Sequence, residues 1–385
     1  MKIVFSHCTQ SYPINFSASN VKVEYISKGL MLKEADVVII NDVLGDRKLH
    51  KNMKATKNNI TYYLFQRSGK NVFKIMKNIL SCVNILCREY RKNDLNILFV
   101  GGVFPVFILQ ILVAKILGYK CVFLTQEWSL SLNNKRLIDK IGAYCSCFLY
   151  GKIVDVILPI SHFLYDKNLH FKKPMLLTPI LADFKDDNTE YKIQYYNHFA
   201  YCAGAAYFRV IKMMLGAYKL FVENGGEQKL ILIISGREKD INDIKEYVKQ
   251  MGLEKMVIFK HQIPYEELMD IYKSSLGLLI PLDPDSVQDK ARFSQKIAEY
   301  LSVKRPLITS NVGEIPFYFT PYKDILVAEY NEKAYCDAMS FLAKNIQKAD
   351  AIGKEGFYTG RREFDYRAMG EKMYNFFINL DKWKI

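Results

Sequence analysis

The sequence predicts an α/β protein that consists of two parallel-sheet domains. The chain has 385 residues, which is more than one ordinary hydrophobic core organises. Short runs rich in β-branched residues alternate with longer amphipathic segments, a pattern typical of strands and helices in α/β layers. A polar stretch near residues 182–197 divides this alternation into two series. Since 50% of the residues are hydrophobic and 24% are charged, the composition is that of a globular protein.

Each series supplies enough strands for a sheet of its own. In the first series we expect strands at residues 2–5, 36–40, 61–65, 97–100, 121–124, 156–159 and 175–178. In the second series we expect strands at residues 199–204, 230–235, 256–260, 276–280, 306–310 and 325–328. Helix-like segments separate these runs. The simplest architecture is therefore two Rossmann-like domains that face each other across a ligand-binding cleft.

One apolar stretch, residues 98–114, approaches the ~20 residues that a membrane-spanning helix needs. Because Gly101, Gly102 and Pro105 interrupt it, we predict a strand, a turn and a buried helix instead. The first residues lack the apolar region of a signal peptide. Eight cysteines occur without a CxxC pair, which favours reduced, buried thiols over a disulfide or zinc framework. These observations favour a cytoplasmic location.

The net charge of +14 is concentrated in residues 46–92, which hold twelve Lys and Arg residues against two acidic ones. Four of these cations share one face of a predicted helix: Lys70, Lys74, Lys77 and Arg88. Such a stripe is either a solvated face or a surface for an anionic partner, lipid or nucleic acid. No RNA-binding signature accompanies it. We therefore expect peripheral contact with the inner face of an anionic membrane, and no nucleic-acid partner.

Residues 290–316 carry the strongest chemical signal. They predict a loop, a helix that begins near Ser294 or Gln295, a strand and a second loop. The start of a helix exposes backbone N–H groups and a positive dipole end, which favour a diphosphate. Lys296 lies in that first turn, and Glu299 lies one turn further on, where its carboxylate can accept ribose hydroxyls. From the residues alone, an ordinary serine cap with surface charges explains the pattern equally well.

The run FSQKIAEYLSVKRPLITSNVGEIP, from Phe293 to Pro316, resembles the nucleotide-sugar signature of glycosyltransferase family 4, the group 1 glycosyltransferases. In that family the glutamate that corresponds to Glu299 binds the ribose of the donor nucleotide. The resemblance further implies that the helix start and its neighbours hold the diphosphate, which selects Ser294, Lys296 and Ile297.

The resemblance extends in the correct order along most of the chain, and it implies the GT-B fold. The run FAYCAGAAYFRVIKMMLGAYKLF is similar to the strand, glycine turn and helix that open the family's donor domain. The residues that it adds to the expected donor site are Ser17, Ser19, Gly204, Arg209, Lys212, Lys260 and His261. The family's C-terminal tail returns to the first domain. We therefore expect domains at 1–180 and 198–365, a linker at 181–197 and a returning helix at 366–385.

Three positions depart from the family pattern. The first glutamate of the E-x7-E pair is replaced by Ala291, the arginine that usually follows Gly204 is replaced by Ala205, and a Gly-Gly loop is replaced by Phe16-Ser17-Ala18-Ser19. The missing first carboxylate weakens any inference about the sugar. Because Ala205 carries no charge, Arg209 or Lys212 is expected to neutralise the leaving diphosphate, Arg209 in preference.

The catalytic residues implied by the resemblance are Glu127, Arg209 and Lys296. Glu127 follows the run CVFLT, and a carboxylate at the carboxyl end of such a strand is expected to face the ligand. No metal site is expected, and the run Asp283-Pro284-Asp285 is better explained as a turn. GT-B enzymes generally work without a bound metal, and their leaving diphosphate helps to deprotonate the acceptor, so no protein nucleophile is required.

The predicted function is that of a retaining glycosyltransferase with a UDP- or GDP-sugar donor. The acceptor is expected to be a glycan or a lipid-linked sugar, in the assembly of a surface polysaccharide or glycoconjugate. Three alternatives remain. They are a nucleotide-sugar-binding protein of this fold without turnover, another enzyme on the same scaffold such as a nucleotide-sugar epimerase, and a nucleic-acid-binding protein that uses residues 46–92.

Overall fold

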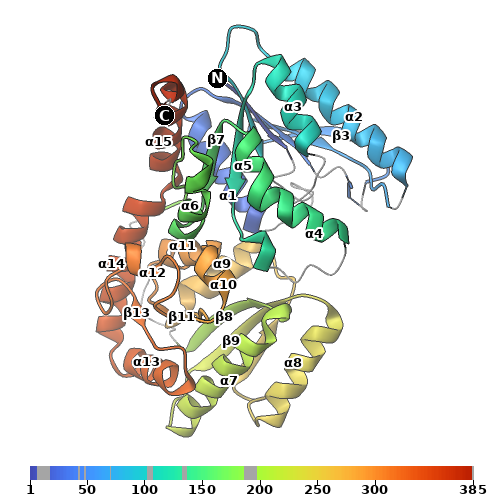
Figure 1. Ribbon diagram of the computed structural model, residues 1–385. Helices are drawn as coiled ribbons and strands as arrows, with labels where there is room; N and C mark the ends of the chain where they lie inside the picture. The colour runs from blue at the N-terminus through green and yellow to red at the C-terminus, as the bar shows by residue number, and fades with distance from the viewer. Residues whose placement is uncertain are drawn as a thin grey trace. The chain divides into compact units, whose positions relative to one another are not determined.

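The computed structural model describes residues 1–6, 18–41, 44–46, 49–69, 71–101, 107–131, 137–185 and 197–383. The chain forms two compact units, each built on one sheet (Figure 1). Unit 1 comprises residues 1–181, 291–293 and 366–385, and unit 2 comprises residues 182–290 and 294–365. Two α/β units with mainly parallel sheets confirm the predicted fold class.

The sheet of unit 1 has the strand order β3-β4-β2-β1-β5-β6-β7. Its strands are β1 (Lys2–Ser6), β2 (Asp36–Ile40), β3 (Met53–Lys57), β4 (Ile60–Leu64), β5 (Asn96–Val100), β6 (Lys120–Thr125) and β7 (Val156–Pro159). The central strands β1 and β5 are buried along their whole length, since helices cover both faces of a parallel sheet. Six of the seven predicted runs in this half are strands of this sheet.

Two features of this sheet differ from the prediction. Residues 175–178 were expected to form a strand, but they make only a single bridge, between Met175 and Ile157, because Pro174 and Pro179 flank them and donate no hydrogen bonds. Conversely, β3 was not predicted. It pairs antiparallel with β4 at the exposed edge, and its polar sequence shows no buried face.

The helices of unit 1 include the first and the last long helix of the chain. They are α1 (Ala18–Met31), α2 (Val72–Glu89), α3 (Phe107–Leu117), α4 (Leu137–Tyr144), α5 (Tyr150–Ile153), α6 (His162–Asn168) and α15 (Tyr366–Ile378). Helices α1 and α15 pack closely, because a Cβ atom on Gly370 would lie 2.4 Å from the Cα atom of Gly29. The Phe377 ring of α15 meets the Phe99 ring of β5 edge-on, at 5.7 Å between centroids.

The apolar stretch at residues 98–114 is divided between β5 and α3, as the glycines and proline predicted. Throughout the described part of the chain, no helix has the length and apolar character that a membrane crossing requires.

The sheet of unit 2 is entirely parallel, with the order β10-β9-β8-β11-β12-β13. Its strands are β8 (His198–Gly204), β9 (Lys229–Ser235), β10 (Val257–Lys260), β11 (Gly277–Ile280), β12 (Leu307–Thr309) and β13 (Leu326–Val327), and all six were predicted. Its helices are α7 (Phe208–Glu223), α8 (Glu238–Gln250), α9 (Tyr265–Ser274), α10 (Val287–Ala291), α11 (Gln295–Ser302), α12 (Ile315–Tyr318), α13 (Glu332–Lys344) and α14 (Ile346–Phe364). The order reverses at β8, because the chain first moves outward to β9 and β10 and then returns to β11. Ligands of doubly wound sheets bind at the carboxyl end of such a switch point.

Candidate functional site in unit 2

The carboxyl ends of β8 and its neighbours bring several of the predicted residues to one edge of the unit 2 sheet. Gly204 ends β8, and Arg209 lies in the first turn of α7, which follows it. Lys260 ends β10, and His261 comes directly after it. Since all these strands are parallel, the residues after them share an edge by construction.

Glu299 is the most unusual acidic side chain at this site. It lies in α11, where it is only 6% exposed, and burial raises its pKa to about 7 against the opposing charge of Lys296. Within the described residues its carboxylate accepts no hydrogen bond from another side chain or from the backbone. A buried carboxylate without such partners is unfavourable as an anion. Hydroxyl donors from a ligand would relieve this cost.

The start of α11 is also open to a ligand. Ser294 occupies the N-cap position with extended backbone, yet its side chain makes no capping hydrogen bond. No acidic residue lies in the first turn, and Lys296 there is half-buried. The positive dipole end of this helix therefore combines with a cation, which suits an anionic ligand. Ile297, in contrast, is fully buried in the helix core face.

Gly313 shapes the loop after β12. Its φ of +62° is in the left-handed region, and a Cβ atom there would lie 2.5 Å from the carbonyl oxygen of Asp289. Glycine alone meets both conditions without strain. The glycine of the signature is therefore required for the close packing of this loop on α10.

Arg209 forms an ion pair with Asp283, a partner that the sequence did not reveal. The Asp283 carboxylate is 4% exposed, whereas the Arg209 side chain is 74% exposed. Asp283 also accepts a 2.9 Å hydrogen bond from the backbone N–H of Asp285, which confirms the predicted Asp-Pro-Asp turn. Because a guanidinium has five N–H donors, Arg209 can keep this pair and still offer donors to solvent or a ligand.

Lys212 lies against two aromatic rings. Its ammonium nitrogen is 4.6 Å from the centroid of Phe208 and 4.9 Å from that of Tyr247 in α8. This packing gives Lys212 a local role in joining α7 and α8. Arg209 is consequently the better placed of the two cations after β8.

Lys260 and His261 are both held by neighbouring groups. Lys260 pairs with Glu267 at 3.0 Å, and Nδ1 of His261 lies 2.7 Å from the carbonyl oxygen of Ile234 at the end of β9. The second contact orients the imidazole ring along the sheet edge.

Within unit 1, Glu127 follows β6 and is solvent-accessible, although surrounding protein atoms raise its pKa by desolvation and Arg292 opposes this shift. Arg292 belongs to the short segment 291–293, which groups with unit 1. Ser161, the N-cap of α6, donates a hydrogen bond of 2.5 Å to the carbonyl oxygen of Ala291. Ala291, which replaces the first glutamate of the family pattern, therefore contributes its backbone carbonyl to this hydrogen bond.

Some predicted residues fall outside this description. Ser17 and Lys70 lie outside the described residues, and Ser19 lies in the first turn of α1. Lys74, Lys77 and Arg88 are exposed on α2. In the described ranges, no group of three His, Cys, Asp or Glu side chains is arranged to hold a metal ion.

Comparison with known proteins shows the GT-B fold and a family match over less than half of the chain. Residues 197–357 match the family model described as "Glycosyl transferases group 1". No curated protein sequence matches the chain. Among solved structures, sucrose-phosphate synthase from Thermosynechococcus elongatus superposes with a TM-score of 0.72 at 13% identity, covering 99% of each chain. A glycosyltransferase from Rickettsia africae gives 0.71 at 15% identity, covering 99% of this chain and 98% of that one. Anabaena HepE in complex with UDP and glucose gives 0.72 at 11% identity, covering 97% and 98%.

Proposed function

We propose that this chain, which has the GT-B fold, is a group 1 glycosyltransferase. It transfers a sugar from a UDP- or GDP-sugar to a glycan or lipid-linked acceptor, with retention of the anomeric configuration. The setting that we propose is the assembly of a surface polysaccharide or glycoconjugate at the inner face of an anionic membrane. The complex of Anabaena HepE with UDP and glucose makes UDP-sugars the first donors to test.

The observation that carries this proposal is the buried Glu299 behind an uncapped helix start. The carboxylate suits the two hydroxyls of a ribose, and the positive dipole end of α11 with Lys296 suits the diphosphate on the same nucleotide. The two groups belong to one short helix, so a single ligand can reach both. A nucleotide sugar has its ribose and diphosphate directly joined, which fits this spacing.

The proposed reaction needs charge neutralisation more than it needs a protein nucleophile. The acceptor hydroxyl oxygen forms a bond to the anomeric carbon while the bond from that carbon to the diphosphate oxygen breaks. The acceptor proton passes to the leaving diphosphate on the same face of the sugar. Arg209 and Lys296 would stabilise the charge that develops on the diphosphate. Glu127 is proposed to bind hydroxyls of the sugar or the acceptor.

We also propose that no metal ion takes part, since Arg209, Lys296 and the dipole of α11 would supply the charge that a metal otherwise provides. Chelation with EDTA should then leave the rate of transfer unchanged. Loss of activity with EDTA, restored by Mg²⁺ or Mn²⁺, would overturn this part of the proposal.

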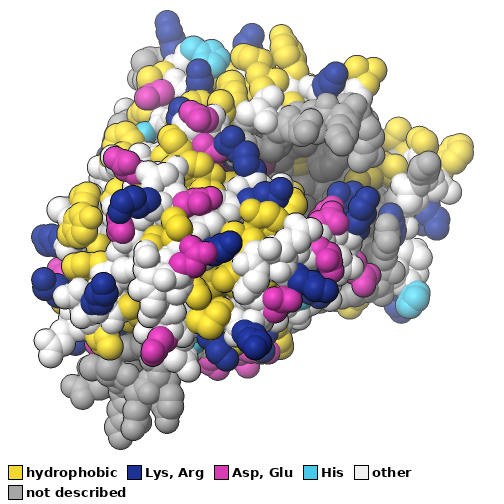
Figure 2. Space-filling view, turned by 90° about the horizontal axis from the view of Figure 1, so that it is seen from below, with side chains coloured by type: hydrophobic (Ala, Val, Ile, Leu, Met, Phe, Trp, Pro, Cys, Tyr) yellow, Lys and Arg dark blue, Asp and Glu magenta, His cyan; other side chains and the backbone are white. Residues whose placement is uncertain are grey.

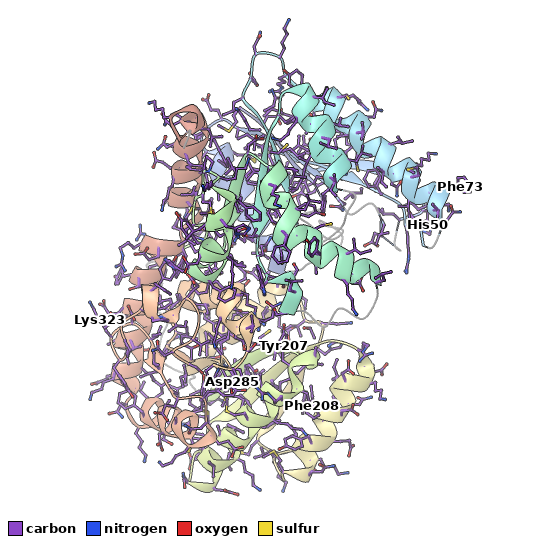
Figure 3. All side chains as sticks on the ribbon, in the orientation of Figure 1. His50, Phe73, Tyr207, Phe208, Asp285 and Lys323 are labelled. Atoms are coloured by element: carbon purple, nitrogen blue, oxygen red, sulfur yellow. The ribbon has the colours of Figure 1, made fainter. Side chains whose placement is uncertain are left out.

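Helix α2 supports the proposed membrane contact. Phe73 is 88% exposed and Val72 is 69% exposed, and Figure 3 shows Phe73 pointing away from the molecule. Met76 and Leu80 are also exposed, beside the cations Lys74 and Lys77. By contrast, basic and acidic side chains are intermingled over the face shown in Figure 2. An exposed helix with both apolar and basic side chains suits the interface of an anionic bilayer.

A panel of UDP- and GDP-sugars tests the function. One nucleotide class should raise the melting temperature, and the stabilising sugar nucleotide should be consumed when an acceptor is added. The anomeric configuration of the product, measured by NMR coupling constants, should equal that of the donor. Inversion would disprove the retaining assignment, and no stabilisation by any member would argue against the donor site.

A further inference from the structure

A pocket lies in unit 1, between α15 and the segment that contains Met175 and Leu176. Its volume is ≈ 570 Å³, a size typical of small-molecule sites. The lining residues are Met175, Leu176, Lys372, Asn375, Phe376, Asn379 and Lys382. None of the residues assigned to sugar transfer lines it. The pocket is therefore a separate feature with a chemistry of its own.

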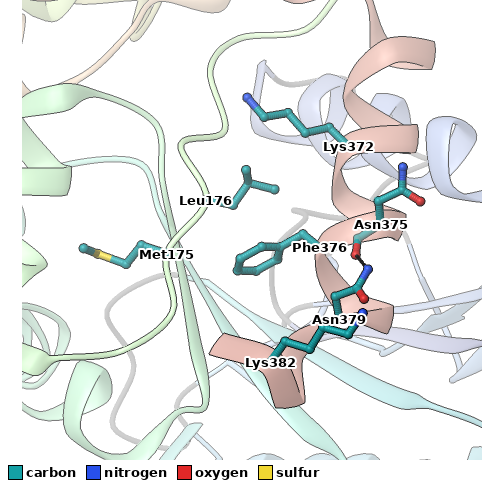
Figure 4. A pocket seen from close by; sticks show the side chains of 7 residues that line it. All are labelled: Met175, Leu176, Lys372, Asn375, Phe376, Asn379 and Lys382. Carbon is teal, nitrogen blue, oxygen red and sulfur yellow. Dashed lines mark hydrogen bonds between the residues drawn. The ribbon is translucent and has the colours of Figure 1, made fainter. Parts of the chain in front are cut away.

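The pocket combines an apolar floor with a basic rim. Figure 4 shows the Phe376 ring between the α15 ribbon and the segment that carries Leu176. Phe376 is buried, while Met175 and Leu176 are half-buried, so apolar surface remains for a ligand. Lys372 and Lys382 are exposed, and within the described residues neither forms an ion pair. Their positive charges are thus available to an anion.

Two amide side chains complete the rim. Asn379 donates a 2.8 Å hydrogen bond to the backbone carbonyl oxygen of Asn375, one helical turn earlier. This contact leaves the second N–H of the Asn379 amide and the Asn375 side-chain amide to donate to a ligand. Amide donors and two lysines match the oxygens of a phosphate or carboxylate, whereas the floor matches a hydrocarbon chain.

We propose that this pocket binds an amphiphilic anion, a medium-length alkyl chain that carries a phosphate or carboxylate head. The chain lies on Phe376, Leu176 and Met175, and the head pairs with Lys372 or Lys382 at the rim. A ligand that has only the alkyl chain would leave the lysines without a partner, and a ligand that has only the anionic head would leave the apolar floor without contacts. This site goes beyond the proposed sugar transfer and does not depend on it.

The two walls of the pocket come from segments that lie near the ends of unit 1 in the sequence. One wall belongs to α15, which begins at Tyr366, directly after unit 2 ends at Asp365. The other wall, Met175 and Leu176, lies shortly before the chain leaves unit 1 at Leu181. A ligand that touches both walls contacts two segments of unit 1 that are far apart in the sequence.

Calorimetry on the full chain tests this proposal with octyl phosphate, octanoate, octanol, inorganic phosphate and octyltrimethylammonium, all below their micelle concentrations. Octyl phosphate or octanoate should bind about threefold more tightly than octanol, since an exposed ion pair is added to the same apolar contact, and more tightly than phosphate, which lacks that contact. The octyltrimethylammonium cation should bind most weakly. The better of the two anionic probes identifies the head group.

The double substitution Lys372→Met and Lys382→Met separates charge from packing. It should reduce the affinity for the anionic amphiphile to that for octanol, whereas Lys354→Met on α14 should leave it unchanged. Equal binding of octanol and both anionic probes to the wild type, or unchanged binding by the double variant, would overturn the proposal. Tighter binding of the ammonium probe would also overturn it.

Discussion

At the scale of single residues, the central feature is a glutamate that is close to losing its charge at neutral pH. Burial raises the pKa of Glu299 to about 7, so an appreciable fraction of the free protein is protonated there near neutrality. Ribose hydroxyls donate hydrogen bonds and so favour the carboxylate form. Ligand binding and ionisation of Glu299 are therefore linked.

This linkage predicts a pH-dependent donor affinity. Because only the ionised form accepts the hydroxyls, the affinity should fall as the pH drops through about 7, by about tenfold between pH 8 and pH 6. Titration of the sugar nucleotide by calorimetry at both values measures this, since its diphosphate does not titrate in that range. Glu299→Gln should remove most of the dependence. A wild-type affinity that is flat over this range would contradict the proposed role of the carboxylate.

Arg209 and Lys296 are the cations that should act on the diphosphate. Each alanine substitution should slow turnover by roughly 10²–10³-fold, as for other groups that stabilise transition-state charge. Lys212→Ala serves as the matched control, because its ammonium rests on two rings, and it should reduce turnover much less. If Lys212→Ala were the more harmful change, the assignment of the phosphate cation to Arg209 would be wrong.

Sequence reasoning identified the cations at this edge but not their partners. The sequence favoured Arg209 over Lys212, and the contacts of Lys212 with two rings support that preference. The ion pair between Arg209 and Asp283 joins residues that are 74 positions apart, so no local sequence pattern indicates it. A carboxylate three residues after the end of a buried strand was nevertheless a usable signal for Asp283.

At the scale of secondary structure, α2 is the element that should meet the membrane. Substitution of Lys70, Lys74 and Lys77 by glutamate should release the protein from anionic liposomes, because each nearby lysine contributes ~1 kcal/mol. The same change at Lys239, Lys245 and Lys249 of α8 is the matched control and should have little effect. Donor hydrolysis should stay the same in both variants. Failure of the wild type to bind anionic liposomes at low salt would mean that α2 is only a solvated face.

Helix α1 contains a lysine whose burial affects stability. Lys22 donates a 2.9 Å hydrogen bond to the carbonyl oxygen of Thr178, and burial lowers its pKa to about 7. Since the unfolded chain binds this proton more tightly, Lys22 should make the protein more stable as the pH rises from 7 toward 10. Thermal unfolding at pH 7 and pH 9 should show this rise, and Lys22→Met should reduce it. An unchanged pH dependence in the variant would contradict the lowered pKa.

The strands were predictable where burial left a clear apolar run, and less so at the edge. β3 has the polar sequence MKATK, and its exposed position requires no apolar side chain. The signal that could have revealed it is the turn. Asn58 and Asn59 have φ values of 51° and 60°, as a two-residue hairpin requires, and asparagine tolerates that conformation. At residues 175–178 the apolar run was misleading, because the flanking prolines were the stronger signal.

At the scale of the whole molecule, the residues and surfaces with a proposed function are distributed over both units. Unit 2 carries the family match together with Arg209, Lys296 and Glu299. Unit 1 carries Glu127, the exposed side chains of α2 and the pocket beside α15. The nucleotide end of the donor is therefore tested through unit 2 alone, without any assumption about the acceptor.

The most direct test is the affinity of the stabilising sugar nucleotide for the wild type, Glu299→Ala and Glu246→Ala, measured by calorimetry at pH 8. Glu246 is an exposed residue of α8 and serves as the control. The loss of charged hydrogen bonds to the ribose should cost about 1.5–3 kcal/mol in Glu299→Ala, with its melting temperature retained. Glu246→Ala should bind like the wild type. Equal affinity of Glu299→Ala and the wild type would contradict the donor site proposed for α11.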